Sequence, residues 1–219
     1  MASAPRIKLC GITSLDDANL AVEAGAWAIG CILWPGSPRA CDRDEAARIA
    51  AAVRRRALVC GVFVNAHLDE VAELVDALGL TMVQLHGDEG PAYCAEIARR
   101  TGAKVIKAAA VSGQADVQAL EMFHTDFHML DAHRPGMRGG TGETFDWELV
   151  RARRSSIPLI LSGGLRAENV GEAIAATRPF AVDTASGTEA SPGVKDPAKV
   201  AAFVEAVQAS ALAEPGAVR

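Results

Sequence analysis

The chain has 219 residues, half of them hydrophobic, and its 22 basic and 27 acidic side chains give a formal net charge of −5. This composition excludes an intrinsically disordered protein, and the mildly acidic balance disfavours nucleic acid as a partner. The longest weakly polar stretch, residues 24–35, is too short to span a bilayer, so we expect no membrane partner either.

Eight short apolar segments predict β-strands. They are three to seven residues long and mostly continuous rather than alternating, as in strands that are covered on both faces. In chain order they are residues 7–10, 27–33, 58–64, 82–85, 104–109, 127–130, 159–161 and 180–182.

Segments with helical periodicity lie between these strands. Apolar residues recur at helical spacing in 46–53 and in 68–78. Thr13 and Asp16 form a capping-box pattern, which predicts that the first helix begins after Thr13. The Asp-Pro pair at 196–197 predicts the start of the last helix.

The alternation of eight strands with seven or eight helices predicts an α/β protein. A (β/α)8 TIM barrel and a doubly wound open sheet both alternate in this way, and the count of eight favours the barrel. No linker or internal repeat interrupts the pattern, so we predict one domain over residues 1–219, with 214–219 as a loose tail. In a barrel, function belongs at the C-terminal ends of the strands.

The cysteines predict a reducing compartment. Their odd number and the lack of any Cys-x-x-Cys pair argue against a disulfide framework and against a structural zinc site. The first residues contain no apolar stretch long enough for a signal peptide, so we expect a cytoplasmic protein. The five cysteines are Cys10, Cys31, Cys41, Cys60 and Cys94.

Glycine-rich turns follow the seventh and eighth predicted strands. Gly163 and Gly164 end the seventh strand, and Ser186 and Gly187 follow the eighth. Barrels commonly bind phosphate in these two loops, through backbone N–H groups. Either turn alone is more typical of ordinary chain reversal, whereas the two in this order favour a phosphate site.

Cys10 ends the first strand and is a candidate base. Lys8 lies two residues earlier, so both side chains share one face of the strand. A nearby ammonium group favours the thiolate, which is the form that accepts a proton. The alternative is a small buried hydrophobic residue, which is the commoner role of a free cysteine.

Three further polar residues lie at predicted strand ends or in the loops that follow. Asp131 closes the sixth strand and is either a general acid whose pKa partial burial raises or the cap of a turn. The long loop after it has the composition either of a lid over an anionic ligand or of an ordinary solvated loop. Arg39 either clamps a carboxylate or lies on the surface. His86, on the same strand face as Gln84, either reaches the barrel mouth or is a packed histidine.

Seven sequence blocks follow one another along the chain: IKLCGIT at 7–13, WPGSPR at 34–39, GVFVN at 61–65, VQLHGDE at 83–89, LD…GGTGETFDW at 130–147, LILSGGL at 159–165 and VDTASGTEASPGVKD at 182–196. In this order they closely resemble the phosphoribosylanthranilate isomerase family of tryptophan biosynthesis. The resemblance covers nearly the whole chain.

The resemblance implies a TIM barrel that performs an Amadori rearrangement of N-(5-phosphoribosyl)anthranilate without a metal or an organic cofactor. It places the general base on Cys10, the general acid on Asp131 and the binding of the anthranilate carboxylate on Arg39. The expected protein is a monomer or a homodimer with a small phosphosugar substrate. Further substrate-binding candidates are Gly163, Gly164, Ser186 and Gly187 for the phosphate, and Gly140, Asp183 and His86.

Two positions depart from the family pattern, and three other functions compete. Ala185 stands where a serine is common in the phosphate loop, which is the predicted phosphate-binding turn at 185–187, and Trp34 stands where tyrosine or phenylalanine is usual.

A histidine-pathway isomerase that performs the same rearrangement would have an aspartate in place of Cys10 and a repeated half-barrel. A non-catalytic phosphate sensor would lack the acid and base. A thiol redox protein would have a resolving cysteine beside Cys10.

Overall fold

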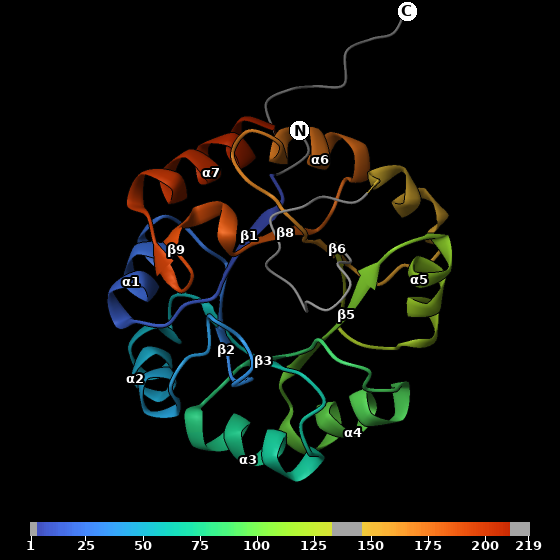
Figure 1. Cartoon of the computed structure of the whole chain (residues 1–219). Helices are drawn as coiled ribbons and strands as arrows, with labels where there is room; N and C mark the ends of the chain where they lie inside the picture. Colours follow the sequence, from blue (N-terminus) through green and yellow to red (C-terminus); the bar gives the residue numbers. More distant parts are fainter. Residues whose placement is uncertain (1–3, 133–145, 211–219) are drawn as a thin grey trace, which may run out of the picture.

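A closed barrel of eight parallel strands, ringed by helices, forms the core of the computed structural model, which describes residues 4–132 and 146–210 (Figure 1). Each strand pairs with the next, and β8 pairs with β1 to close the ring. The barrel prediction is therefore confirmed over the open sheet. The strands are β1 (Arg6–Cys10), β2 (Ala28–Ile32), β3 (Leu58–Phe63), β4 (Met82–Leu85), β5 (Lys104–Val111), β6 (Phe127–Ala132), β7 (Leu159–Leu161) and β8 (Ala181–Thr184).

Helices cover the outside of the barrel, as Figure 1 shows. The α-helices of the described residues are α1 (Leu15–Glu23), α2 (Arg43–Val53), α3 (Leu68–Leu78), α4 (Pro91–Thr101), α5 (Gln114–Ala119), α6 (Val170–Thr177) and α7 (Pro197–Ser210). Three short 3-10 helices accompany them: η1 (Leu120–Met122), η2 (Trp147–Ala152) and η3 (Ser186–Thr188). Between β6 and β7, η2 packs against α5 and α6. A small hairpin of β9 (Glu189–Ser191) and β10 (Val194–Lys195) follows β8.

The start of the first helix differs from the predicted one by a residue. Ser14, not Thr13, is the N-cap of α1, and its hydroxyl accepts a hydrogen bond from the backbone N–H of Asp17 at 3.2 Å. The capping-box prediction at Thr13 was wrong because the Thr13 hydroxyl donates instead to the carbonyl of Gly193 in the β9–β10 turn. A contact 180 residues away in sequence thus decided a local feature.

Two hydrophobic layers hold the barrel together. The larger lies between the strands and the helices, and the smaller fills the barrel interior. The N-terminal end of the interior is closed by Trp27, Phe127 and Phe180, whose ring centroids lie 5.4–5.5 Å apart. Because this end is plugged, a ligand approaches from the C-terminal ends of the strands.

Two strands run further than the sequence pattern predicts. β5 continues to Val111, and β6 continues to Ala132, so that Asp131 lies inside β6 rather than at its end. No helix within residues 4–132 and 146–210 has both the length and the apolar character needed to cross a membrane. The predicted tail at 214–219 lies outside the described residues.

Candidate active site

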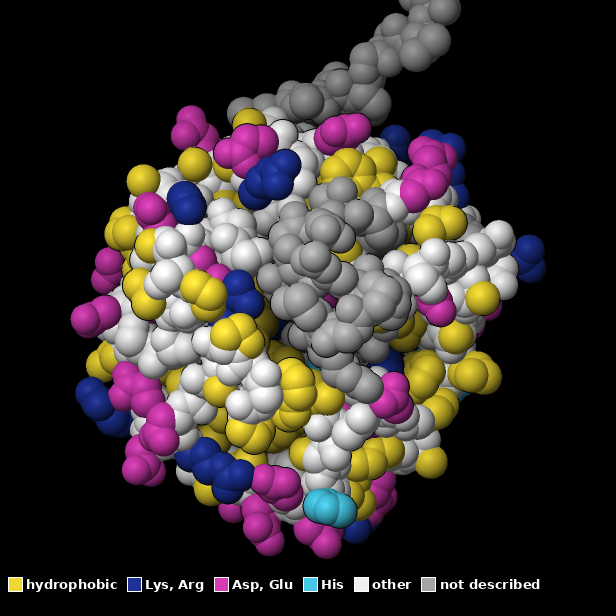
Figure 2. All heavy atoms as spheres, in the orientation of Figure 1, with side chains coloured by type: hydrophobic (Ala, Val, Ile, Leu, Met, Phe, Trp, Pro, Cys, Tyr) yellow, Lys and Arg dark blue, Asp and Glu magenta, His cyan; other side chains and the backbone are white. Residues whose placement is uncertain are grey.

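A cavity of about 740 Å³ opens at the C-terminal ends of the strands. Figure 2 shows hydrophobic side chains gathered just below the centre of this face, while most of the visible charged side chains lie toward its periphery. Most of the candidates predicted from sequence line the cavity, although they come from six different parts of the barrel. They are Cys10, Arg39, His86, Asp131, Gly163, Gly164, Asp183 and Ser186.

Cys10 is placed by a glycine on the neighbouring strand. It is the last residue of β1 and pairs in register with Gly30 of β2. A Cβ atom at Gly30 would lie 2.8 Å from the Cys10 sulfur and 3.2 Å from Nζ of Lys8. Gly30 therefore makes the room that both side chains occupy. A glycine inside a predicted strand is a recognised sign that other atoms approach the backbone closely at that position. Gly30 was not among the site residues predicted from the sequence.

Charges around Cys10 act in opposite directions on its pKa. Burial raises the pKa of the thiol above its ordinary value, Lys8 and Lys195 lower it, and Asp183 raises it. The net direction is upward, so the predicted effect of Lys8 is present but is outweighed by burial. A thiolate formed here is scarcer at neutral pH than an ordinary one, and it is also a stronger base.

Lys8 is itself neutralised by Asp183. Its ammonium lies 2.8 Å from Oδ1 of Asp183, and both side chains are buried. Oδ2 of Asp183 accepts a hydrogen bond from the Ser162 hydroxyl at 3.0 Å. Asp183 was a candidate substrate ligand, and the structure places it at the cavity wall with these two partners.

Asp131 is buried and held in a defined orientation. Its Oδ1 accepts the backbone N–H of Ala132 at 2.9 Å, and its Oδ2 lies 3.2 Å from Nε2 of His86. Nδ1 of His86 lies 2.8 Å from the side-chain amide nitrogen of Gln84. Because that amide donates to Nδ1, the imidazole carries its proton on Nε2 and points it at Asp131. Gln84 and His86 share a strand face as predicted, and through His86 they orient the carboxyl group.

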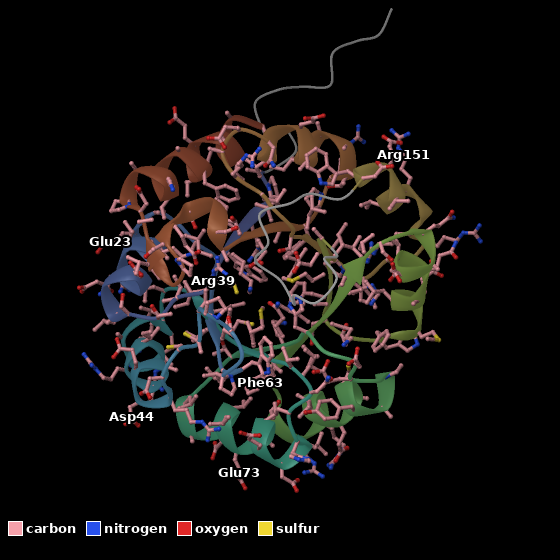
Figure 3. The ribbon with its side chains drawn as sticks, in the orientation of Figure 1. Glu23, Arg39, Asp44, Phe63, Glu73 and Arg151 are labelled. Carbon is pink, nitrogen blue, oxygen red and sulfur yellow. The ribbon has the colours of Figure 1, made fainter. Side chains whose placement is uncertain are left out.

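Arg39 is not the surface residue that one interpretation of the sequence allowed. It is buried at the cavity wall, and Figure 3 shows it toward the barrel centre, whereas Glu23 and Asp44 lie on the outer ring. Its Nε lies 2.9 Å from each carboxylate oxygen of Glu189, and its Nη2 lies 2.8 Å from Oε2. A guanidinium held on two of its nitrogens is rigid enough to orient a ligand.

The two glycine-rich turns lie together at the cavity wall. Gly163 and Gly164 have φ angles of 90° and 62°, in the left-handed region. Ser186 begins η3, whose first N–H groups have no partner inside the helix. A Cβ at Gly187 would collide with the carbonyl of Leu165, so the glycine allows the two backbone segments to pack closely. Gly187 does not line the cavity. The predicted candidate Gly140 lies outside the described residues.

Glu189 and Lys195 are site residues that were not predicted from the sequence. Both are buried charged residues in the β9–β10 hairpin, and Glu189 contacts Arg39 directly. Their signal in the sequence was their position in the last of the seven blocks, beside the phosphate loop. Within the described part of the chain, no three His, Cys, Asp or Glu side chains are grouped to hold a metal ion.

Comparisons with known proteins show similarity to one enzyme family. The family described as N-(5'phosphoribosyl)anthranilate (PRA) isomerase matches residues 7–206. The N-(5'-phosphoribosyl)anthranilate isomerase of Citrifermentans bemidjiense is 44% identical over 207 residues, which cover 94% of this chain and 98% of the relative. The phosphoribosyl anthranilate isomerase of Thermus thermophilus has a TM-score of 0.85 at 35% identity, with 93% of this chain and 98% of that chain covered. A phosphoribosyl anthranilate isomerase solved in complex with reduced 1-(o-carboxyphenylamino)-1-deoxyribulose 5-phosphate has a TM-score of 0.81 at 37% identity, with 94% and 99% covered.

Proposed function

The chain belongs to the N-(5'-phosphoribosyl)anthranilate isomerase family, and from this premise we propose a general acid–base mechanism in which Asp131 is the acid and Cys10 is the base. The reaction is the rearrangement of N-(5'-phosphoribosyl)anthranilate to 1-(2-carboxyphenylamino)-1-deoxyribulose 5-phosphate, a step of tryptophan biosynthesis. The reaction moves hydrogen within the substrate, so the enzyme must donate and accept protons in turn.

The first step of the proposed mechanism opens the furanose ring. Asp131 protonates the ring oxygen, the C1–O bond breaks, and the nitrogen lone pair forms an iminium ion at C1. The carboxyl group is supported for this role by its burial at the cavity wall and by the two contacts that orient it, from Ala132 and His86. A proton donor must lie within hydrogen-bond reach of its target, so a fixed orientation favours the transfer.

The second step removes the proton at C2. The iminium ion draws electrons from the C2–H bond, and the Cys10 thiolate takes the proton to give an enolamine. The enolamine then gains a proton at C1 and loses the hydroxyl proton at C2, which yields the ketone, and proton exchange with solvent returns Asp131 to the acid and Cys10 to the thiolate. Burial raises the pKa of the thiol, and a more basic thiolate abstracts a carbon-bound proton more readily. Lys8 and Lys195 oppose this shift by lowering the pKa of the thiol, and so they increase the fraction of Cys10 that is ionised.

One observation carries the proposal: Cys10 and Asp131 face the same cavity from β1 and β6, two strands that do not pair with each other. Acid and base therefore act on different atoms of one ligand, with Arg39 and the phosphate loop to hold its two anionic ends. In this arrangement Gly163, Gly164 and Ser186 bind the phosphate through backbone N–H groups.

The test separates chemistry from binding. N-(5'-phosphoribosyl)anthranilate is generated in situ, because it is labile, and its conversion is followed by the loss of anthranilate fluorescence. The proposal requires that variants at Cys10 and Asp131 no longer convert the substrate but still bind the reduced product analogue. This analogue is reduced 1-(o-carboxyphenylamino)-1-deoxyribulose 5-phosphate. Variants that convert it at the wild-type rate would move the acid or the base to other residues.

Replacing Arg39 by alanine is expected to raise KM by roughly 10- to 100-fold with a smaller change in kcat, because hydrogen bonds to charged groups contribute about 1.5–3 kcal/mol. Arg39 is expected to bind the carboxylate equally in the ground state and the transition state, so its loss weakens binding more than chemistry. Steady-state kinetics in the fluorescence assay measure both constants.

The matched control for this prediction is Arg43→Ala. Arg43 also forms an ion pair with a glutamate, Glu70, at 2.6 Å, but both side chains are exposed and lie outside the cavity. This control should leave KM and kcat unchanged. A large fall in kcat with an unchanged KM in Arg39→Ala would contradict the carboxylate role.

A further inference from the structure

Glu189 forms a buried ion pair with Arg39, although it lies outside the proposed chemistry. Both its oxygens lie 2.9 Å from Nε of Arg39, and Oε2 also lies 2.8 Å from Nη2. Only 5% of Glu189 and 8% of Arg39 are exposed. Gly11 leaves space for the pair, since a Cβ there would lie 3.0 Å from Cδ of Arg39 and 3.1 Å from Oε1 of Glu189. A buried pair with this geometry fixes the guanidinium plane.

Lys195 connects this pair to the two other parts of the site. Its ammonium donates to the carbonyl of Cys10 at 2.8 Å and to the carbonyl of Ala185 at 3.0 Å, and it lies 3.4 Å from Oε1 of Glu189. The same side chain thus touches the strand that carries the base, the phosphate loop and the partner of Arg39. Glu189 is held from behind by a buried cation.

Arg39, Glu189 and Lys195 form a charged cluster with a net charge of +1. Arg39 and Lys195 carry two positive charges against the single negative charge of Glu189, so a substrate carboxylate would bring the cluster to neutrality. The pair uses Nε and Nη2 of Arg39, and no described side chain bonds to its Nη1. The carboxylate is therefore expected on the Nη1 edge, with its direction set by Glu189 on the opposite edge.

We propose that Glu189 is a positioning residue that fixes the guanidinium of Arg39 and so determines the enzyme's preference for substrates with a carboxylate on the aromatic ring. This inference rests on the proposed carboxylate role of Arg39. It predicts a ligand-specific effect: without Glu189, the site loses its advantage for a carboxylated ligand and keeps its affinity for the phosphosugar part.

Glu189→Gln tests the proposal because a glutamine side chain has almost the same shape as a glutamate side chain but lacks its negative charge and one acceptor oxygen. Both oxygens of Glu189 face N–H donors, namely Nε of Arg39 on either oxygen and the ammonium of Lys195 on Oε1. Either orientation of a glutamine amide therefore turns an NH₂ group toward a donor and displaces the guanidinium. Positioning is lost even though the net positive charge of the cluster increases.

The experiment measures dissociation constants for two probes: the reduced product analogue, and the same molecule without its carboxyl group. Glu189→Gln is expected to weaken the first probe by roughly 10-fold and the second by less than 2-fold, the scale of one charged hydrogen bond. In the fluorescence assay KM should rise more than kcat falls. Glu189→Asp keeps the charge beside Lys195 but is too short to reach both nitrogens, so it should show the same ligand-specific loss.

Arg39→Ala and Glu70→Gln complete the experiment. Arg39→Ala should abolish the difference in affinity between the probes, and Glu70→Gln, which breaks an exposed ion pair with Arg43, should preserve it. If Arg39→Ala keeps the difference, the proposed role of Arg39 fails. If Arg39→Ala loses the difference but the Glu189 variants keep it, only the present inference fails. Equal weakening of both probes, or tighter binding of the carboxylated one, also overturns the inference, because a structural or purely electrostatic role predicts those results.

Discussion

Replacing Cys10 by serine is expected to reduce kcat by about 10²- to 10⁴-fold, the range that a general base contributes. A serine hydroxyl has nearly the shape of the thiol, but it is a far weaker acid and supplies almost no anion near neutral pH. Burial at this position raises the pKa of the ionising group further. The measurement is turnover at saturating substrate, by the loss of anthranilate fluorescence.

Two controls show that the Cys10→Ser variant fails in chemistry and not in folding. The variant should bind the reduced product analogue within a few-fold of wild type, because the sulfur is not expected to contribute to phosphate or carboxylate binding. Cys94→Ser replaces another buried thiol, on α4 and away from the cavity, and should retain wild-type kcat. Near wild-type turnover in Cys10→Ser would remove Cys10 from the role of base.

Asp131→Asn is expected to reduce kcat by a similar factor, about 10²- to 10⁴-fold, with little change in KM. The asparagine oxygen still accepts the backbone N–H of Ala132, and its NH₂ group then faces Nε2 of His86. Unlike a guanidinium group, the imidazole can accept that hydrogen bond, by moving its proton to Nδ1 while the Gln84 amide turns its oxygen toward Nδ1. The side chain therefore stays close to its native place but has no acidic proton to give to the ring oxygen. Wild type and variant are compared in the same fluorescence assay.

The control for Asp131→Asn is Asp126→Asn, which alters a carboxylate just before β6 at the opposite end of the barrel. Asp126 accepts the backbone N–H of Val105 at 2.9 Å and lies outside the cavity. Its variant is expected to keep wild-type kcat, with at most a lower thermal stability. If Asp131→Asn remains fully active, the reaction stands and the acid must be another group.

Local pattern was sufficient for most of the secondary structure and for the end of the barrel at which the candidate residues lie. Buried strands read as continuous apolar segments because the barrel covers both of their faces, and all eight were found at nearly their observed bounds. Cys10 and Asp131 could be placed at the same edge because parallel strands bring their C-terminal ends together, and the family resemblance then assigned their roles. The error at the start of α1 arose where the Thr13 hydroxyl had a long-range partner.

The partners of the site residues could not be predicted in the same way. Glu189 lies 150 residues from Arg39, and Asp183 lies 175 residues from Lys8. No periodicity relates such positions, and each pair exists only because β8 returns to β1 and closes the ring. The interpretation of Arg39 as a surface residue was wrong for this reason. Its neighbours along the chain form a loop rich in proline and glycine, which is typical of a surface segment, but its neighbour in space is a buried carboxylate.

The sequence by itself determined which segments become strands and helices, that eight units alternate, and which thiol and carboxyl stand near strand ends, since these depend on side chains close together in the chain. Only the tertiary structure decided that the sheet closes, that Arg39 is buried against Glu189, and that the pKa of Cys10 rises despite Lys8. Charge interactions and desolvation depend on distance and burial, and both are set when segments far apart in the chain pack together.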